Sequence, residues 1–176
     1  MAPAEPDIRF RRYETGDHDQ VAALWTRINR ELAPPHMREL FEEYITFVIN
    51  GELKHLSDVF SGAKRNAVWV VETDGKIIGT FGIESCGEDS TELRRMYLDQ
   101  AYRGQGLALS MLQRAEAQAR DLGFSRMILS TSEVQKAAIN FYRKSGYRLT
   151  KTEVADSLST KTAGGGLMRF YFEKAL

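Results

Sequence analysis

The stretch from Leu93 to Leu109 carries a glycine-rich turn whose backbone is suited to hold an anion. It predicts a strand that leads through a short turn, Arg103 to Ala108, into a helix. Gly104 and Gly106 have no Cβ that would obstruct an approaching group, and the first N–H groups of a helix lack intrahelical acceptors. The helix dipole is positive at this end. The turn therefore predicts a pyrophosphate site, although such glycines also occur for steric reasons alone.

Two better-known phosphate-binding motifs do not fit this turn. A Walker loop requires lysine and then serine or threonine after its last glycine, whereas Leu107 and Ala108 follow Gly106. The dinucleotide fingerprint G-x-G-x-x-G fails at its third glycine, where Leu109 stands. A P-loop NTPase and a Rossmann-type dehydrogenase are therefore disfavoured, and the pattern R-x-x-G-x-A remains.

That pattern resembles the coenzyme A turn of the GCN5-related N-acetyltransferases, the GNAT family. QKAAINFYRKSGYR, from Gln135 to Arg148, is similar to the helix of that family that ends in tyrosine, lysine and glycine before a strand. Ile8 to Trp25 resembles the family's opening strand and helix, and Val68 to Ile83 its central hairpin. STSEVQKAAINFYRKSGY is most similar to camello-like members. The resemblance covers the chain from Ile8 to about Leu149.

The resemblance implies acetyl-coenzyme A as cosubstrate, with no metal. Backbone groups of the strand before the turn would bind the pantetheine arm, and the turn itself would bind the pyrophosphate. Gln135 stands where many acetyltransferases carry asparagine, seven residues before the tyrosine, and its amide can still donate and accept. The implied coenzyme-binding residues are Met96, Tyr97, Leu98, Arg103, Gly104, Gln105, Gly106, Leu107, Ala108 and Gln135.

The reaction of such an enzyme is attack of an amine on a thioester. An alkylammonium group has a pKa of about 10 and must lose a proton first, so a base is required. Glu92, near the start of the strand that leads to the turn, is the expected base, directly or through water. Tyr142 is the expected acid for the leaving thiolate. The alternatives are a solvated edge carboxylate, a packed aromatic ring and, for Arg103, a solvated turn residue.

Composition predicts one domain over residues 1–176. The chain has 176 residues, of which 43% are hydrophobic, enough for one buried core and short for two. Lys plus Arg and Asp plus Glu both number 24, so no bulk charge favours nucleic acid or a membrane surface. Cys86 stands alone, and we interpret it as a half-buried strand residue in a protein of a reducing compartment. The N-terminus lacks a signal-peptide core and no run approaches roughly 20 apolar residues, so a cytoplasmic protein is expected.

Metal catalysis is not indicated by the sequence. His18, His36 and His55 stand apart, without the spacing that would place two imidazoles on one helix face. Each is expected at the surface or at a helix end, although His36 or His55 could reach an acceptor pocket. The sequence does not fix the oligomeric state, and a homodimer is among the assemblies expected.

Periodicity and turn residues place the elements that must position these side chains. The predicted strands are Ile8 to Tyr13, Val68 to Val71, Ile77 to Ile83, Glu92 to Leu98, Arg126 to Thr131, Tyr147 to Thr152 and Leu167 to Glu173. The first predicted helix begins near Thr15 or Asp17 and ends before Pro34. The other predicted helices are Met37 to Asn50, Glu52 to Phe60, Gly104 to Leu122 and Gln135 to Lys144. Asp74-Gly75 predicts a hairpin turn, and Gly164 to Gly166 a flexible loop.

This order predicts an α/β (α+β) fold with a mixed, mostly antiparallel sheet and helices on both faces. The resemblance makes this the acyl-CoA N-acyltransferase fold, with roughly seven strands, the fourth and fifth splayed apart. The segment from Glu31 to Phe60 is expected to select the acceptor, and its six acidic residues against two basic ones would suit a cationic amine or form a solvated helix face.

Three functions remain open from the sequence. The leading hypothesis is N-acetylation of a small-molecule primary amine by direct attack in a ternary complex. A second enzymatic hypothesis is acetylation of a protein N-terminus or lysine. The third is a noncatalytic acyl-coenzyme A binding module, against which the presence of both Glu92 and Tyr142 argues.

Overall fold

The computed structural model describes residues 7–60 and 64–176. The part of the N-terminal expectation that concerns residues 1–6 lies outside this range. The described strands are β1 (Arg9–Arg12), β2 (Ala67–Thr73), β3 (Lys76–Ser85), β4 (Ser90–Leu98), β5 (Arg126–Ser132), β6 (Arg148–Ala155) and β7 (Leu167–Ala175). The α-helices are α1 (His18–Leu32), α2 (Arg38–Asn50), α3 (Leu56–Val59), α4 (Leu107–Asp121) and α5 (Lys136–Lys144). Short 3-10 turns are η1 (Thr15–Asp17), η2 (Pro35–Met37), η3 (Leu53–His55) and η5 (Gln100–Tyr102).

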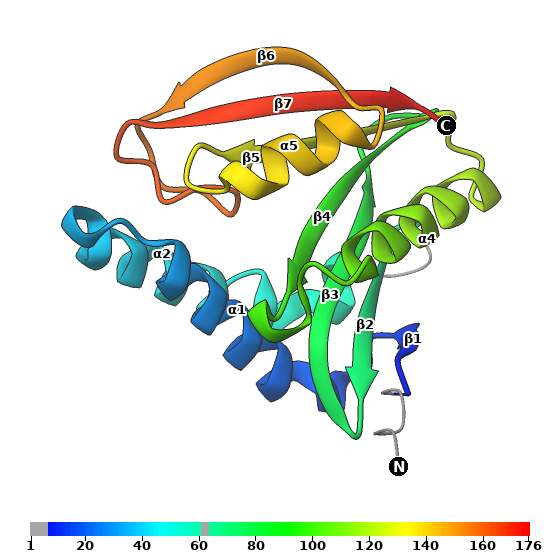
Figure 1. The fold of residues 1–176 in the computed structure, drawn as a ribbon, viewed down its shortest axis with the longest axis horizontal. Helices are drawn as coiled ribbons and strands as arrows, with labels where there is room; N and C mark the ends of the chain where they lie inside the picture. Colours follow the sequence, from blue (N-terminus) through cyan, green and yellow to red (C-terminus); the bar gives the residue numbers. More distant parts are fainter. Residues whose placement is uncertain (1–6, 61–63) are drawn as a thin grey trace.

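The seven strands form one mixed sheet in the order β1-β2-β3-β4-β5-β7-β6. Neighbours pair antiparallel except β4 and β5, which are parallel. A parallel pair requires a crossover connection, and α4 supplies it. The predicted fold class and its number of strands are confirmed. Figure 1 shows β4 and β5 starting side by side near the C-terminus and then diverging.

Helices cover both faces of the sheet and bury two apolar clusters. On one face α4 and α5 contribute residues such as Met111 and Tyr142 to a core with β2, β3, β4, β5 and β7. On the other, α1 and α2 pack residues such as Trp25 and Val48 against β2 and β3. The helical spacing of apolar residues predicts these buried faces, because side chains three and four positions apart share one side of a helix.

The β2–β3 hairpin forms at the predicted dipeptide. Asp74 and Gly75 have φ angles of 50° and 73°, the left-handed backbone that a tight two-residue hairpin turn requires. Aspartate and glycine tolerate this conformation better than most residues do. The hairpin fixes the register of β2 on β3, and β3 in turn carries β4, the strand on which the expected base lies.

Two local predictions are wrong. The fourth helix begins at Leu107 and not at Gly104, because Gly104 and Gly106 have φ angles of 74° and 80°, which no right-handed helix accommodates. Cys86 is exposed in the turn after β3 and is not a half-buried strand residue. Across the described residues, no helix is both long and apolar enough to cross a bilayer.

Candidate active site

A wedge-shaped gap between β4 and β5 defines the candidate site. The two strands pair only over Ser90–Glu92 and Arg126–Ile128. Farther along, β4 contains an irregularity at Arg95, a non-glycine residue with a φ of 53°. An extra residue of this kind bends a strand and increases its twist, which turns β4 away from β5. The predicted divergence of the fourth and fifth strands is therefore confirmed, and the bulge is its local cause.

A cavity of about 90 Å³ lies at this gap. It is lined by β4, β5 and α5, by Arg169 of β7 and by the β6–β7 loop. Five residues predicted from the sequence line it together: Glu92, Met96, Tyr97, Gln135 and Tyr142. The expected base and the expected acid thus share one cavity, although 50 residues of chain separate them.

Tyr142 projects from α5 into an aromatic environment. Its ring lies 5.8 Å from that of Tyr147 and 6.3 Å from that of Phe172, measured between centroids. The side chain is buried, and this burial raises the pKa of Tyr142 above its ordinary value. The phenol is therefore protonated throughout the neutral range and is suited to donate a proton rather than to accept one.

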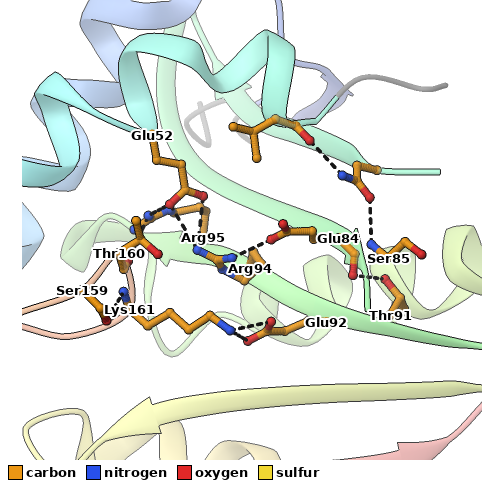
Figure 2. A network of polar contacts seen from close by, with 12 residues as sticks. Glu52, Glu84, Ser85, Thr91, Glu92, Arg94, Arg95, Ser159, Thr160 and Lys161 are labelled. Carbon is orange, nitrogen blue, oxygen red and sulfur yellow. Dashed lines mark hydrogen bonds and ion pairs between the residues drawn. The ribbon is translucent and has the colours of Figure 1, made fainter. Parts of the chain in front are cut away.

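Glu92 forms an ion pair that the sequence did not predict. Lys161 Nζ, on the loop between β6 and β7, donates to Glu92 Oε1 at 2.8 Å and to Oε2 at 2.7 Å. Glu92 is only 8% exposed, so its carboxylate is held in the protein by this single ammonium group. Figure 2 shows the lysine side chain reaching across to it.

The predicted pyrophosphate turn lies farther along, after β4 and η5. The first α-helical hydrogen bond of α4 runs from Ser110 N to Gly106 O, so the N–H groups of the preceding turn have no intrahelical acceptor. A Cβ at Gly104 or Gly106 would meet no protein atom within 4 Å. The turn is therefore open on the side where a phosphate would bind, and it fits the coenzyme chemically.

Three of the predicted coenzyme-binding side chains already make hydrogen bonds within the protein. Gln105 Nε2 donates to Ala101 O at 3.1 Å. Arg103 Nε donates to Leu98 O at 2.9 Å, and Arg103 Nη2 lies 3.7 Å from Glu31 Oε2. The side chain of Gln135 accepts from Thr131 Oγ1 at 2.8 Å and from Ser132 N at 3.3 Å. Leu98 and the turn from Arg103 to Ala108 do not line the cavity. Their contacts with the coenzyme stay predictions.

The acidic residues of the segment from Glu31 to Phe60 lie outside the cavity lining. Glu42 pairs with Arg30, and Glu52 is buried between Arg94 and Arg95 (Figure 2). None of the six acidic residues, and neither His36 nor His55, lines the cavity. Attraction of a cationic amine by this local charge stays a prediction beside the alternative of a solvated helix face.

The buried position of Glu52 predicts that its replacement lowers the stability of the protein. Glu52 binds Arg94 Nη2 at 3.1 Å and also Arg95, and all three side chains are at most 10% exposed. Glu52→Gln leaves two buried arginines without this partner, and we expect it to lower the free energy of unfolding by about 3 to 5 kcal/mol. Urea unfolding followed by circular dichroism measures the change.

Glu42→Gln is the matched control. It breaks the ion pair with Arg30, whose side chain is 59% exposed, and should cost less than about 1 kcal/mol. Equal losses in the two variants would contradict a special role for the buried network.

Comparison with known proteins identifies the family. The model of the acetyltransferase (GNAT) family matches residues 21–147. The uncharacterized N-acetyltransferase YjgM of Escherichia coli is 33% identical over 160 residues, which are 84% of this chain and 84% of that protein. A protein described as a probable N-acetyltransferase camello of Xenopus tropicalis is 33% identical over 92 residues, which are 51% of this chain and 42% of that protein.

A solved structure supports the fold. The PaiA N-acetyltransferase of Thermoplasma acidophilum, crystallised in complex with coenzyme A, aligns with a TM-score of 0.72 at 19% identity, over 97% of this chain and 99% of that one. The chain belongs to the GNAT acetyltransferase family. It is an acyltransferase that depends on acetyl-coenzyme A.

Lys161 and Arg169 are the site residues that sequence reasoning missed. Lys161 lies in a loop with no periodic pattern, so nothing local indicates its ion pair with Glu92. For Arg169 the sequence held a weak indication of burial, because it lies two residues after Leu167 in the apolar run LMRFYF and so shares its face of the strand. Both residues are buried. Among the described residues no three His, Cys, Asp or Glu side chains gather as metal ligands would.

Proposed function

We propose that the protein transfers the acetyl group of acetyl-coenzyme A to the primary amine of a small molecule, by direct attack in a ternary complex. The observation that carries this proposal is that Glu92 and Tyr142 line one cavity at the divergence of β4 and β5. A base and an acid at one cavity suit a reaction in which a nitrogen loses a proton and a sulfur gains one.

The proposed roles balance the reaction. Glu92 accepts a proton from the ammonium group, directly or through water, and the free nitrogen then bonds to the thioester carbonyl carbon. Tyr142 donates its proton to the sulfur as the carbon–sulfur bond breaks, and the second proton lost by the nitrogen restores the phenol. The coenzyme supplies the activated acetyl thioester, which the open turn from Arg103 to Ala108 would anchor through its pyrophosphate.

The ion pair with Lys161 supports Glu92 as a place where an ammonium group can bind. A buried carboxylate without a cation is unfavourable, and Lys161 satisfies it in the free protein. An incoming ammonium group would replace one cation with another, so the number of charges at Glu92 would not change. The acceptor would then be oriented by the same two oxygens that Lys161 contacts.

The β6–β7 loop supports a small acceptor over a peptide. Thr160 O accepts from Arg95 Nη2 at 3.0 Å and from Tyr44 OH at 3.4 Å, which ties the loop to β4 and α2. These contacts hold a loop that lines the cavity through Thr160 and Lys161, whereas a peptide would require an open groove. The test is release of coenzyme A thiol with a panel of small amines and of peptides with free N-termini or lysines. Turnover with peptides alone would favour the second enzymatic hypothesis, and binding without turnover the noncatalytic module.

The proposed role of Glu92 as the base predicts how the rate of a Glu92 variant depends on pH. If Glu92 accepts the ammonium proton, Glu92→Gln should depress the rate most near neutral pH and progressively less as rising pH supplies free amine. Glutamine keeps the size of the side chain, so the fold should be retained. The measurement is the pH dependence of kcat/KM with the best amine of the panel.

Glu84→Gln is the control for this experiment. Glu84 lies opposite Glu92 on the neighbouring strand and binds Arg94 instead of Lys161. A loss that is uniform over pH in Glu92→Gln would indicate substrate positioning. A pH-dependent loss in the Glu84 variant alone would move the base to that residue.

A further inference from the structure

Arg169 is a buried cation of the cavity that has no acidic partner among the described residues. The residue lies on β7 and is 6% exposed, and its side chain donates through Nη2 to Ser130 Oγ at 2.6 Å. The other cations that line the cavity are paired: Arg94 and Arg95 with Glu52, and Lys161 with Glu92. Within residues 7–60 and 64–176, no carboxylate lies within 4 Å of the Arg169 guanidinium.

The nearby carboxylates are bound elsewhere. Glu153 faces Arg169 in the register of β6 on β7, but its carboxylate binds Tyr171 OH at 2.8 Å and lies 3.5 Å from Lys151 Nζ. Both oxygens of Glu92 are held by Lys161. The groups that contact the Arg169 guanidinium in the described part of the chain are neutral: the hydroxyl of Ser130, with the phenol of Tyr171 nearby. Burial lowers its pKa, but an arginine stays charged at neutral pH.

A second unsatisfied group lies beside it. Ser132 is the cross-strand partner of Arg169 on β5, so the two side chains share one face of the sheet. Ser132 Oγ is buried and has no hydrogen-bond partner in the described part of the chain. Both residues line a smaller cavity of about 40 Å³, and Arg169 also lines the cavity with Glu92 and Tyr142. In the described part of the chain, a buried cation without an acidic partner and a buried hydroxyl without any hydrogen-bond partner thus lie at one place.

Energetics argue against a purely structural role. An unpaired buried charge and an unpaired buried hydroxyl each destabilise a fold, and replacing them with apolar groups would remove the cost. A site that retains both is complete when an anion with acceptor oxygens is bound. A carboxylate fits, because its two oxygens can bind a guanidinium and accept from a hydroxyl as well.

We propose that the acceptor amine carries a carboxylate, as an amino acid or an amino acid conjugate does, and that Arg169 and Ser132 bind it. This proposal rests on the proposed acetylation of a small amine. Glu92 would hold the ammonium group and Arg169 the carboxylate, so the two charges of an amino acid would meet opposite charges in one connected site. Arg169 thereby sets specificity, and it takes no part in proton transfer.

The first experiment compares matched acceptors. Release of coenzyme A thiol is measured with L-amino acids, their primary amides and their decarboxylated amines. We expect kcat/KM to be about 10²-fold higher for the acids than for the amides. An amide group lowers the pKa of the neighbouring amine, so a larger fraction of that amine is unprotonated at neutral pH. Amine protonation alone would therefore favour the amides, and it does not explain a preference for the acids.

Variants assign this preference to Arg169. Arg169→Gln should lower kcat/KM for the acids about 10²-fold, mainly through KM, and change it little for the amides. Ser132→Ala should have a smaller effect of the same kind. Arg148→Gln, at an exposed arginine bound to Glu173, is the control and should leave the preference intact. Arg169→Met tests the alternative that Arg169 only supports the fold, and its melting temperature should equal or exceed that of the parent protein.

A second measurement does not depend on turnover. Protein saturated with coenzyme A is titrated calorimetrically with N-acetyl amino acids and with the corresponding N-acetyl amines. Binding of the acids alone, lost in Arg169→Gln, supports the carboxylate site, even if no acetylation is seen and the proposed function therefore fails. Equal binding or equal turnover of the uncharged compounds, or a preference that persists in Arg169→Gln, would overturn the carboxylate site and leave amine acetylation standing.

Discussion

Gly106→Val is expected to abolish binding of acetyl-coenzyme A while the protein stays folded. Gly106 has a φ of 80° and precedes the first residue of α4. A β-branched residue disfavours this left-handed backbone strongly, so the peptide is expected to rotate and redirect the N–H groups that the pyrophosphate would meet. Isothermal calorimetry with acetyl-coenzyme A measures the loss, and circular dichroism verifies the fold.

The same helix offers a matched control for this variant. Gly123, just after the other end of α4, has a φ of 87° and equally open surroundings. Gly123→Val therefore introduces the same backbone strain without touching the turn, and it should keep its affinity. Normal binding by Gly106→Val would show that the coenzyme turn is misplaced. A loss in both variants would indicate damage to the helix itself.

Removal of the Tyr142 hydroxyl is expected to lower turnover roughly 10²- to 10⁴-fold with little change in coenzyme A affinity. The phenylalanine ring of Tyr142→Phe would keep the packing against Tyr147 and Phe172, whereas the proton donor is lost. The measurement is kcat under conditions in which added viscogen does not change the rate, so that chemistry is limiting. Unchanged turnover under these conditions would remove Tyr142 from the mechanism.

A variant of Tyr147 distinguishes an effect of aromatic packing from an effect of proton transfer by Tyr142. Tyr147 is also buried and packs edge-on against Tyr142, but its hydroxyl donates to Glu116 Oε1 of α4 at 3.0 Å. Tyr147→Phe should therefore lower stability and leave kcat largely unchanged. A similar loss of kcat in both variants would mean that the aromatic cluster acts by positioning alone.

Local signals in the sequence were sufficient for most of the fold. The Asp74-Gly75 hairpin and the amphipathic helices depend on residues close in the chain, and they occur where their patterns predict them. The start of α4 was misplaced because glycine is compatible with both a helix and a left-handed turn, and only the folded backbone distinguishes them.

The site was predictable only in part, for a physical reason. Glu92 and Tyr142 belong to motifs that the family resemblance identifies. Lys161 and Arg169 reach the cavity from a loop and from the last strand, which pairs between β5 and β6. Their partners, or lack of partners, depend on contacts between residues far apart in sequence, as for Glu52 with Arg94 and Arg95. Such pairings are a property of the tertiary structure.

The short pairing of β4 with β5 has a consequence for handling the protein. Beyond Glu92, no strand among the described residues pairs with β4 on that side, which leaves part of a strand edge unpaired at the gap. Unpaired strand edges are templates for association with another chain and promote aggregation. An extended ligand that binds along this edge would act as an added strand and cover it. Coenzyme A in purification buffers should therefore reduce aggregation of the protein, which light scattering with and without the ligand would measure.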